Sequence, residues 1–291
     1  MNRKKAVLHL VLFVLTIYST SIAGAMFDEY GFTFPALVHL ILNPASLRAG
    51  FPFSFWLIFI LGVHEMGHYL TCRKYGVPAT LPFFIPGPTL FGTFGAVIRI
   101  RGIIPDRNVL FDIGMAGPVA GFLASIPALV LGLSQAAIVH APLQEGDVLF
   151  GDSFLIWILE KFMFSDSGPD LVIAVNSVFY AGWAGLLATT MNLFPVGQLD
   201  GGHICYAISR KFHRILSITA IFMMAALVMY SLFEKGVSVW LLWLLILIIM
   251  GSRHPALLFE EKPLSGKRKL FSLFALLILI LSFMPNPIYI H

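Results

Sequence analysis

The sequence has few charged residues. Asp, Glu, Lys and Arg make up 12% of its 291 residues, whereas about a quarter of a soluble domain is charged. Hydrophobic residues reach 58%, and 27 residues are phenylalanine. A chain with so little charge cannot cover a water-exposed surface, so the composition excludes an ordinary soluble domain and indicates a membrane protein.

Cysteine is also scarce. Cys72 and Cys205 are the only two, which excludes a disulfide-stabilised fold. Both are expected on the reducing side of the membrane, where each serves as a small packing residue. No internal repeat or low-complexity tract stands out, and the loop of residues 135–170 is too short for an ordinary inserted domain. The sequence therefore predicts one membrane domain over residues 1–291.

Long apolar runs are abundant. A helix needs about 20 apolar residues to cross a bilayer, and seven runs approach or reach this length, the sixth being short. They cover residues 6–24, 51–72, 111–134, 171–195, 212–233, 237–251 and 269–285. We therefore expect an all-α polytopic membrane protein with about seven transmembrane helices. The first run follows "MNRKK", and its weak small-residue cleavage site predicts a retained anchor rather than a signal peptide.

The basic residues are distributed unevenly over the predicted loops. If the N-terminus is cytoplasmic, alternating crossings place all but three of the 19 basic residues on the cytoplasmic side, the exceptions being Arg48, Lys161 and Lys235. Because this bias follows the positive-inside rule, we predict a cytoplasmic N-terminus and attribute the net charge of +4 to topology rather than to nucleic-acid binding. The predicted outer loop is acidic and carries Glu145, Asp147, Asp152, Glu160, Asp166 and Asp170.

The second apolar run contains the polar sequence "HEMGH". An ionised side chain in the middle of a spanning helix costs about 2.5 to 3.5 kcal/mol, so such residues point to a function. His64 and His68 lie one turn apart on one helix face, with Glu65 beside them. In H-E-x-x-H sequences the two imidazoles bind zinc and the glutamate acts as a general base. The alternative is a hydrogen-bonded packing cluster without a metal.

Two histidines leave a catalytic zinc one protein ligand short. Asp200 is the candidate for the third ligand, because Pro195 should break the helix containing Asn192 and leave Asp200 on unwound chain. His64 lies nine residues before Arg73, and Asp200 lies ten residues before Arg210. At about 1.5 Å per helical residue, the two sites come to a similar depth on the same side of the membrane.

At these residues the sequence resembles the site-2 protease family of intramembrane zinc metalloproteases. The resemblance covers roughly residues 51–210, in matching order. Its motifs are "HEMGH" (64–68), "GTFGAVIRIRGIIPDR" (92–107), "FDIGMAGPVAGF" (111–122) and "NLFPVGQLDGGH" (192–203). The chain has no room for the PDZ or CBS domain of many bacterial relatives.

The resemblance implies one Zn²⁺ per chain, held by His64, His68 and Asp200. It also implies that Glu65 activates water and that Asn192 orients the substrate or stabilises the oxyanion. The expected substrates are membrane proteins with a transmembrane helix, cut in or near that helix, and no nucleic acid is involved. Residues 51–210 would form a catalytic three-helix core, 6–50 an N-terminal anchor and outer loop, and 211–291 accessory helices. The absence of a transit-like leader favours a bacterial plasma membrane.

Two further features carry two interpretations each. The segment "GAVIRIRG" alternates apolar and basic residues, which predicts a strand of a small hairpin between the second and third spans. This strand serves either as an edge for an extended substrate or as scaffold. Gly114, Gly117 and Gly121 form a small face, which we interpret as helix packing. His203 and Cys72 are minor candidates for additional metal ligands.

Two other functions fit parts of the sequence. A transporter or metal permease would line an ion path with intramembrane His and Asp residues, but it has no need of a glutamate between two ligands. A catalytically inactive relative would bind and retain membrane proteins, but the complete ligand set argues against it.

Overall fold

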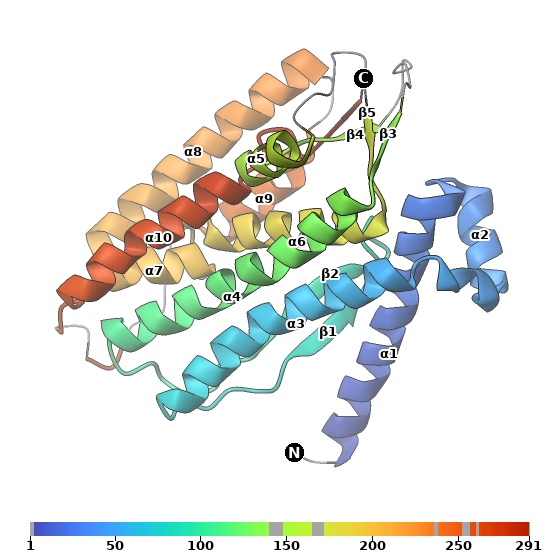
Figure 1. The fold of residues 1–291 in the computed structure, drawn as a ribbon. Coiled ribbons are helices and arrows are strands. Elements are labelled where there is room, and N and C mark those ends of the chain that lie inside the picture. Colours follow the sequence, from blue (N-terminus) through green and yellow to red (C-terminus); the bar gives the residue numbers. More distant parts are fainter. Residues whose placement is uncertain are drawn as a thin grey trace.

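The computed structural model describes residues 3–139, 148–164, 172–235, 238–251, 257–259 and 262–290. Three helices that pack closely on one another form its centre (Figure 1): α3 (Phe51–Lys74), α4 (Arg107–Ser134) and α6 (Ser177–Leu193). Gly67 of α3 lies so close to α4 that an added Cβ would stand 2.5 Å from the Ala116 carbonyl oxygen. The side chains of α3 therefore reach directly onto α4.

Local sequence signals set the ends of these helices. The side chain of Asp106 accepts hydrogen bonds from the Asn108 and Val109 N–H groups at 2.9 and 3.1 Å, and thereby caps the N-terminus of α4. Asn176 caps α6 in the same way, through the Phe179 N–H at 3.1 Å. The α6 helix ends at Leu193, two residues before Pro195, as expected for a residue that cannot continue a helix.

A β-hairpin lies between α3 and α4 in the chain. Strands β1 (Phe83–Pro86) and β2 (Thr93–Val97) pair antiparallel, with Phe83 opposite Val97. Helix α1 (Arg3–Ala25) packs against β1, where Phe13 contacts Phe84 at a ring separation of 5.3 Å. The hairpin comes earlier in the chain than "GAVIRIRG" suggested, because β2 ends at Val97 and only its last three residues, 95–97, belong to that segment. In the rest of that segment, an isolated bridge joins Ile100 to Ala79.

Four helices complete the C-terminal part: α7 (Asp200–Ile208), α8 (Arg210–Lys235), α9 (Trp240–Met250) and α10 (Gly266–Ser282). An ion pair fixes the start of α10 to α4, since Arg268 donates to both carboxylate oxygens of Asp112 at 2.7 Å each. Tyr75, directly after α3, donates a short hydrogen bond to the same carboxylate. One polar cluster therefore holds together the ends of three helices.

The remaining elements gather at the opposite end of the molecule from the N-terminus (Figure 1). They are η1 (Met26–Tyr30), α2 (Phe34–Leu42), η2 (Pro44–Arg48), α5 (Phe154–Met163) and four short strands, β3 (Ala137–Val139), β4 (Val148–Phe150), β5 (Val172–Ala174) and β6 (Ile288–Ile290). β3 pairs with β5, and β4 pairs with β6. The fold is therefore mostly helical with three two-stranded sheets, rather than helical with one hairpin.

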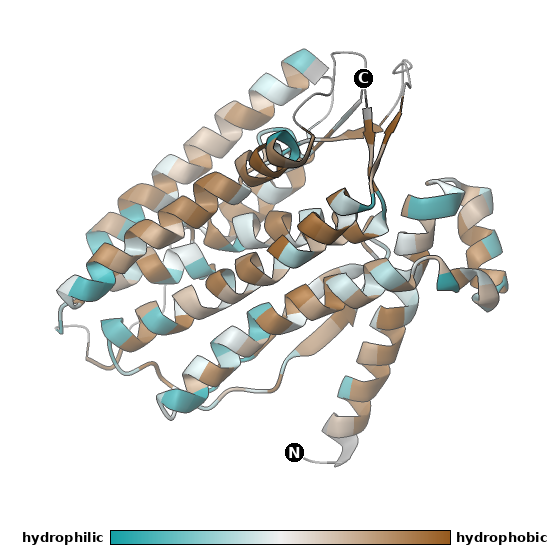
Figure 2. Ribbon diagram, in the orientation of Figure 1, coloured by the Kyte–Doolittle hydropathy of each residue, from teal (hydrophilic) through white to brown (hydrophobic). Residues whose placement is uncertain are grey.

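The outer surface of the helices is apolar. Figure 2 shows hydrophobic residues along most of α1, α8 and α10, with hydrophilic residues toward their ends. Large exposed apolar side chains include Phe222 at 71% and Ile249 at 85%. In water such a surface would be unfavourable, whereas in a bilayer it contacts hydrocarbon. The chain is an integral membrane protein.

Helix length and composition bear on the number of membrane spans. Each of the seven apolar runs contains a helix, but among the described residues three helices are both long and apolar enough to cross a membrane, within Ala6–Tyr30, Arg107–Ser134 and Arg210–Glu234. The α9 helix has 11 residues, and α6 begins at Ser177 because residues 172–174 form β5. Seven spans remain a prediction. Of the acidic residues in the predicted outer loop, Glu145, Asp147, Asp166 and Asp170 lie outside the described residues.

Candidate active site

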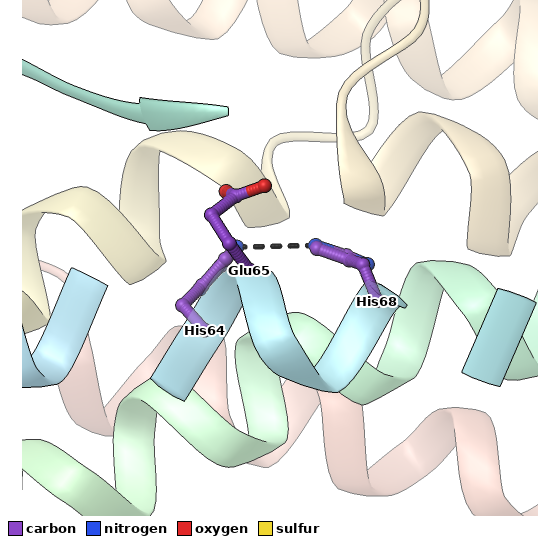
Figure 3. A group of neighbouring side chains, drawn as sticks. All are labelled: His64, Glu65 and His68. Carbon is purple, nitrogen blue, oxygen red and sulfur yellow. Dashed lines mark hydrogen bonds between the residues drawn. The ribbon is translucent and has the colours of Figure 1, made fainter. Parts of the chain in front are cut away.

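Three polar side chains of α3 meet in the centre of the molecule. His64, Glu65 and His68 are 5%, 8% and 6% exposed, and their ligand atoms all lie within 4.8 Å of one another. The Nε2 atoms of the two imidazoles are 3.2 Å apart (Figure 3). Because the two histidines are four residues apart in a continuous helix, their rings stand one above the other on the same face.

Asp200 comes from a different part of the chain and reaches the same point. Its Oδ2 atom lies 3.3 Å from His64 Nε2 and 3.3 Å from His68 Nε2. The chain is not helical from Phe194 to Leu199, as expected after Pro195, but Asp200 is the first residue of α7. Our expectation that Asp200 itself lies on unwound chain is therefore wrong. The new turn packs closely on the preceding chain, because Gly201 lies against the end of α6 at Leu193 and Gly202 lies against the loop at Val196 and Gly197.

The separations of these three atoms match those expected of zinc ligands. Two ligands of a tetrahedral zinc at about 2.0–2.1 Å from the metal lie about 3.3–3.4 Å apart. The three observed separations are 3.2, 3.3 and 3.3 Å. Two imidazoles and one carboxylate are also a donor set that catalytic zinc sites use. The residues present therefore fit a zinc ion with a fourth position left for water or substrate.

The ring of His68 is held in the orientation that a metal ligand needs. Its Nδ1 atom lies 2.7 Å from the Ile113 carbonyl oxygen of α4. A carbonyl oxygen only accepts hydrogen bonds, so Nδ1 carries the proton and Nε2 presents a lone pair. A hydrogen bond of this kind fixes the tautomer and direction of metal-binding histidines.

Two glycines of α4 make room for the imidazoles. A Cβ at position 117 would stand 2.5 Å from His68 Cδ2 and closer still to its Nε2, and a Cβ at 121 would stand 2.8 Å from His64 Nδ1. We interpreted Gly117 and Gly121 from the sequence as residues of helix packing. They do let α4 approach α3 closely, and the side chains that they pack against are the candidate metal ligands.

The Glu65 carboxylate lies near the two imidazole rings and farther from the α3 backbone (Figure 3). Its Oε2 atom accepts a hydrogen bond of 2.8 Å from the Ile98 N–H, in the chain directly after β2. This bond holds the carboxylate beside the three candidate ligands without using its other oxygen. The contribution of Ile98 could not be predicted from residue types, because its backbone N–H makes the contact.

A cavity of about 250 Å³ opens onto these side chains. Its walls include Ala96, Val97 and Ile98 on one side and Asn192, Gln198 and His203 on the other. The amide nitrogen of Asn192 lies 3.4 Å from His64 Nε2. All five residues predicted for the site therefore lie together. Cys72 instead packs in an apolar cluster with Val77, Val109 and Ile113.

Helix α8 holds the loop that leads to Asp200. The hydroxyl of Ser217 donates to the Pro195 carbonyl oxygen at 2.7 Å, and His213 Nε2 lies 3.1 Å from the Gly197 carbonyl oxygen. Both side chains are buried. The unwound loop would otherwise bury carbonyl groups without partners. We did not identify these two residues from the sequence, since they lie outside the recognised motifs.

The fold and the site together define a membrane-embedded protein with a metallopeptidase-type H-E-x-x-H centre. The chain belongs to peptidase family M50, whose sequence pattern matches residues 52–233. This match confirms the resemblance to the site-2 proteases and extends it beyond residue 210.

Several plant proteins are similar over most of the chain. The chain is 29% identical to "Probable zinc metalloprotease EGY1, chloroplastic" of Arabidopsis thaliana, over 96% of this chain and 53% of that protein. It is 31% identical to "Probable zinc metalloprotease EGY2, chloroplastic" of the same plant, over 89% and 46%. The chain thus spans about half the length of these relatives.

Proposed function

We propose that the protein is an intramembrane zinc-dependent endopeptidase, which hydrolyses peptide bonds in or near the transmembrane segments of other membrane proteins. The observation that carries this proposal is the close triangle of His64 Nε2, His68 Nε2 and Asp200 Oδ2, with Glu65 next to it. Membership of family M50 and the names of the relatives support it. A structural zinc site would close the fourth position with a further ligand.

His64, His68 and Asp200 would hold one zinc ion per chain. When bound, zinc lowers the pKa of a water molecule and polarises a carbonyl oxygen. The residues of the chain supply the remaining parts of the reaction. The Ile113 carbonyl and the glycines of α4 orient His68 and leave space for its ring.

Glu65 is the proposed general base and acid. The Ile98 N–H holds one of its oxygens at 2.8 Å, so the other is directed to the space beside the metal ligands. There the carboxylate takes a proton from the attacking water and later returns it to the nitrogen of the leaving amine. A peptide bond is thereby broken and one water is consumed.

Asn192 is the proposed partner of the substrate carbonyl. Its amide nitrogen reaches the edge of the ligand triangle, 3.4 Å from His64 Nε2. An amide N–H is neutral and can donate to the oxygen on which negative charge develops. Its position on α6, on a different helix from Glu65, lets the two groups act on opposite sides of one peptide bond.

We further propose a cytoplasmic N-terminus and an active site nearer the cytoplasmic side, from the distribution of basic residues. Residues 51–210 would be the catalytic core and 211–291 accessory. A bacterial plasma membrane is our prediction for the location, although the names of the relatives carry the word chloroplastic. The family and the names of the relatives do not favour the metal permease that we considered.

The test is cleavage of a panel of single-span membrane proteins by the purified protein in detergent or vesicles. Glu65→Gln should abolish cleavage and keep the zinc, whereas His68→Ala should lose both. Glu160→Gln, on α5 and outside the lining of the site cavity, is the matched control and should cleave normally. Full activity of Glu65→Gln would rule out the proposed chemistry, and equal zinc content of wild type and His68→Ala would rule out the proposed ligand.

A further inference from the structure

A second cavity lies beside the candidate active site, among α7, α8 and α10. Its volume is about 300 Å³. Helix α7 separates the two spaces: Asp200 and His203 line the site cavity, whereas Gly201, Ile204 and Cys205 line this one. We call it the α8–α10 groove. Its far walls are Phe212 and Leu216 of α8 and Ser272, Leu273, Leu276 and Leu279 of α10.

The lining argues against an extended peptide as the occupant. The groove has one hydroxyl, and Ser272 already donates it to the Lys269 carbonyl at 2.6 Å. An extended peptide would therefore leave its backbone N–H and C=O groups without partners in an apolar space. A hydrocarbon chain has no backbone groups that need hydrogen-bond partners, so it suits this lining.

The groove has positive charge at one end. Arg210 and Lys211 directly precede the lining residue Phe212 on α8, and Lys269 lies one turn before Leu273 on α10. All three are exposed. Figure 2 shows these helix starts as hydrophilic ends of otherwise hydrophobic helices. By contrast, Arg268 is paired with Asp112.

We propose that the α8–α10 groove binds one acyl chain of an anionic phospholipid, with its phosphate held by Lys269 and by Arg210 or Lys211. Lysine and arginine are the residues that bind phosphate oxygens, and a basic cluster next to the membrane surface attracts anionic lipid. The acyl chain would pack on Pro195, which lies in the loop that leads to Asp200, and on Gly201, which directly follows Asp200. The proposal depends on the membrane location of the protein and not on its peptidase activity.

The test measures lipid contact directly. The full-length protein is placed in phosphatidylcholine vesicles that contain a trace of phosphatidylglycerol with a photoreactive diazirine on one acyl chain. After illumination, labelled peptides are mapped by mass spectrometry. We expect labelling of the segments that contain Phe212–Leu216 and Ser272–Leu279. Lys269→Gln should lower this labelling about fivefold, the effect of one basic residue at an anionic surface.

Two pairs of neighbouring residues on α10 give matched variants. Leu276→Trp should fill the groove and abolish the labelling, whereas Leu277→Trp should not, because Leu277 is equally exposed on α10 (47% against 52%) but does not line the groove. Lys267→Gln is the control for Lys269→Gln. Equal labelling by a photoreactive phosphatidylcholine would overturn the proposal, as would wild-type labelling of Leu276→Trp. Displacement of the label by a transmembrane substrate peptide would assign the groove to substrate instead.

Discussion

Gly117 of α4 lies against the metal-binding edge of the His68 ring, and no other residue fits at this position. An added Cβ would overlap Nε2, the atom that we propose to bind zinc. The carbonyl of Ile113, one turn earlier on α4, accepts the hydrogen bond from the other nitrogen of the same ring. Helix α4 therefore fixes the tautomer of His68, which belongs to α3, and also provides the space that its ring occupies.

The first prediction is that Gly117→Ala loses zinc. The added methyl group must push the His68 ring away from the triangle, so we expect zinc affinity to fall by about 10- to 100-fold or more, as for other changes that misplace a ligand. The measurement is zinc content after dialysis against a graded chelator. The control is Gly62→Ala on α3, where a Cβ would meet Phe84 at an ordinary 3.5 Å. Unchanged zinc affinity of Gly117→Ala would show that the ring does not need this space.

The candidate site could be predicted from the sequence to the extent that residue types reveal chemistry. His64, Glu65, His68, Asp200 and Asn192 are polar residues in apolar surroundings, which is a signal in itself. Ile98 and Ile113 act through backbone atoms, and Gly117 acts by having no side chain. Such contributions depend on three-dimensional contact, so a small-residue face on α4 is indistinguishable in sequence from ordinary helix packing.

The second prediction concerns the loop between α6 and α7. Ser217→Ala removes the hydroxyl that donates to the buried Pro195 carbonyl, and an unsatisfied buried group costs about 1–3 kcal/mol. The loop can relax only by moving, and Asp200 moves with it. We expect zinc affinity to fall about tenfold with a small loss of thermal stability. Ser231→Ala, at another buried serine of α8, should change stability alone. An equal loss of zinc in both variants would argue against a specific role of Ser217.

The third prediction concerns topology. Arg101 lies six residues before the start of α4 and Asp152 lies two residues after the end of β4, and Figure 1 shows these two points at opposite ends of the molecule. Both residues are exposed, and the native cysteines are buried or partly buried. In intact cells, a membrane-impermeant maleimide should label Asp152→Cys readily, and should label Arg101→Cys only after the membrane is permeabilised. The reverse pattern would show that the basic residues face outward and that our use of the positive-inside rule fails.

The fold was predictable for elements whose structure depends on their own sequence alone. Each apolar run contains a helix, because length and composition determine that outcome. The hairpin lies earlier in the chain than we predicted. The alternation in "GAVIRIRG" reflects only a local preference for strand, whereas β2 ends where its partner strand begins, at Phe83 opposite Val97. Strands β4 and β6 pair across about half of the chain, and such a pairing has no local sequence signal.

The last prediction concerns the choice of substrate. A transmembrane helix keeps its carbonyl groups hydrogen-bonded within the helix, so it cannot present one to the site while wound. Local unwinding exposes polar backbone groups at several kcal/mol each unless other groups receive them. Among the described residues, β2 pairs on one side with β1, and Ala96 and Val97 of its end line the site cavity. An unwound substrate can pair with this edge as an additional strand.

Substrates that unwind easily should therefore be cut faster. Gly, Pro or Asn within a turn or two of the cytoplasmic end of the span lowers helix stability, by about 1 kcal/mol for Gly and about 3 kcal/mol for Pro relative to Ala. Replacing these residues by Leu in a cleaved substrate should slow cleavage by about three- to fivefold for Gly, more for Pro and less for Asn. The measurement is the initial rate at equal substrate density in vesicles, with Leu substitutions at the outer end of the same span as the control. Equal rates for the two sets of substitutions would show that helix stability near the site does not limit cleavage.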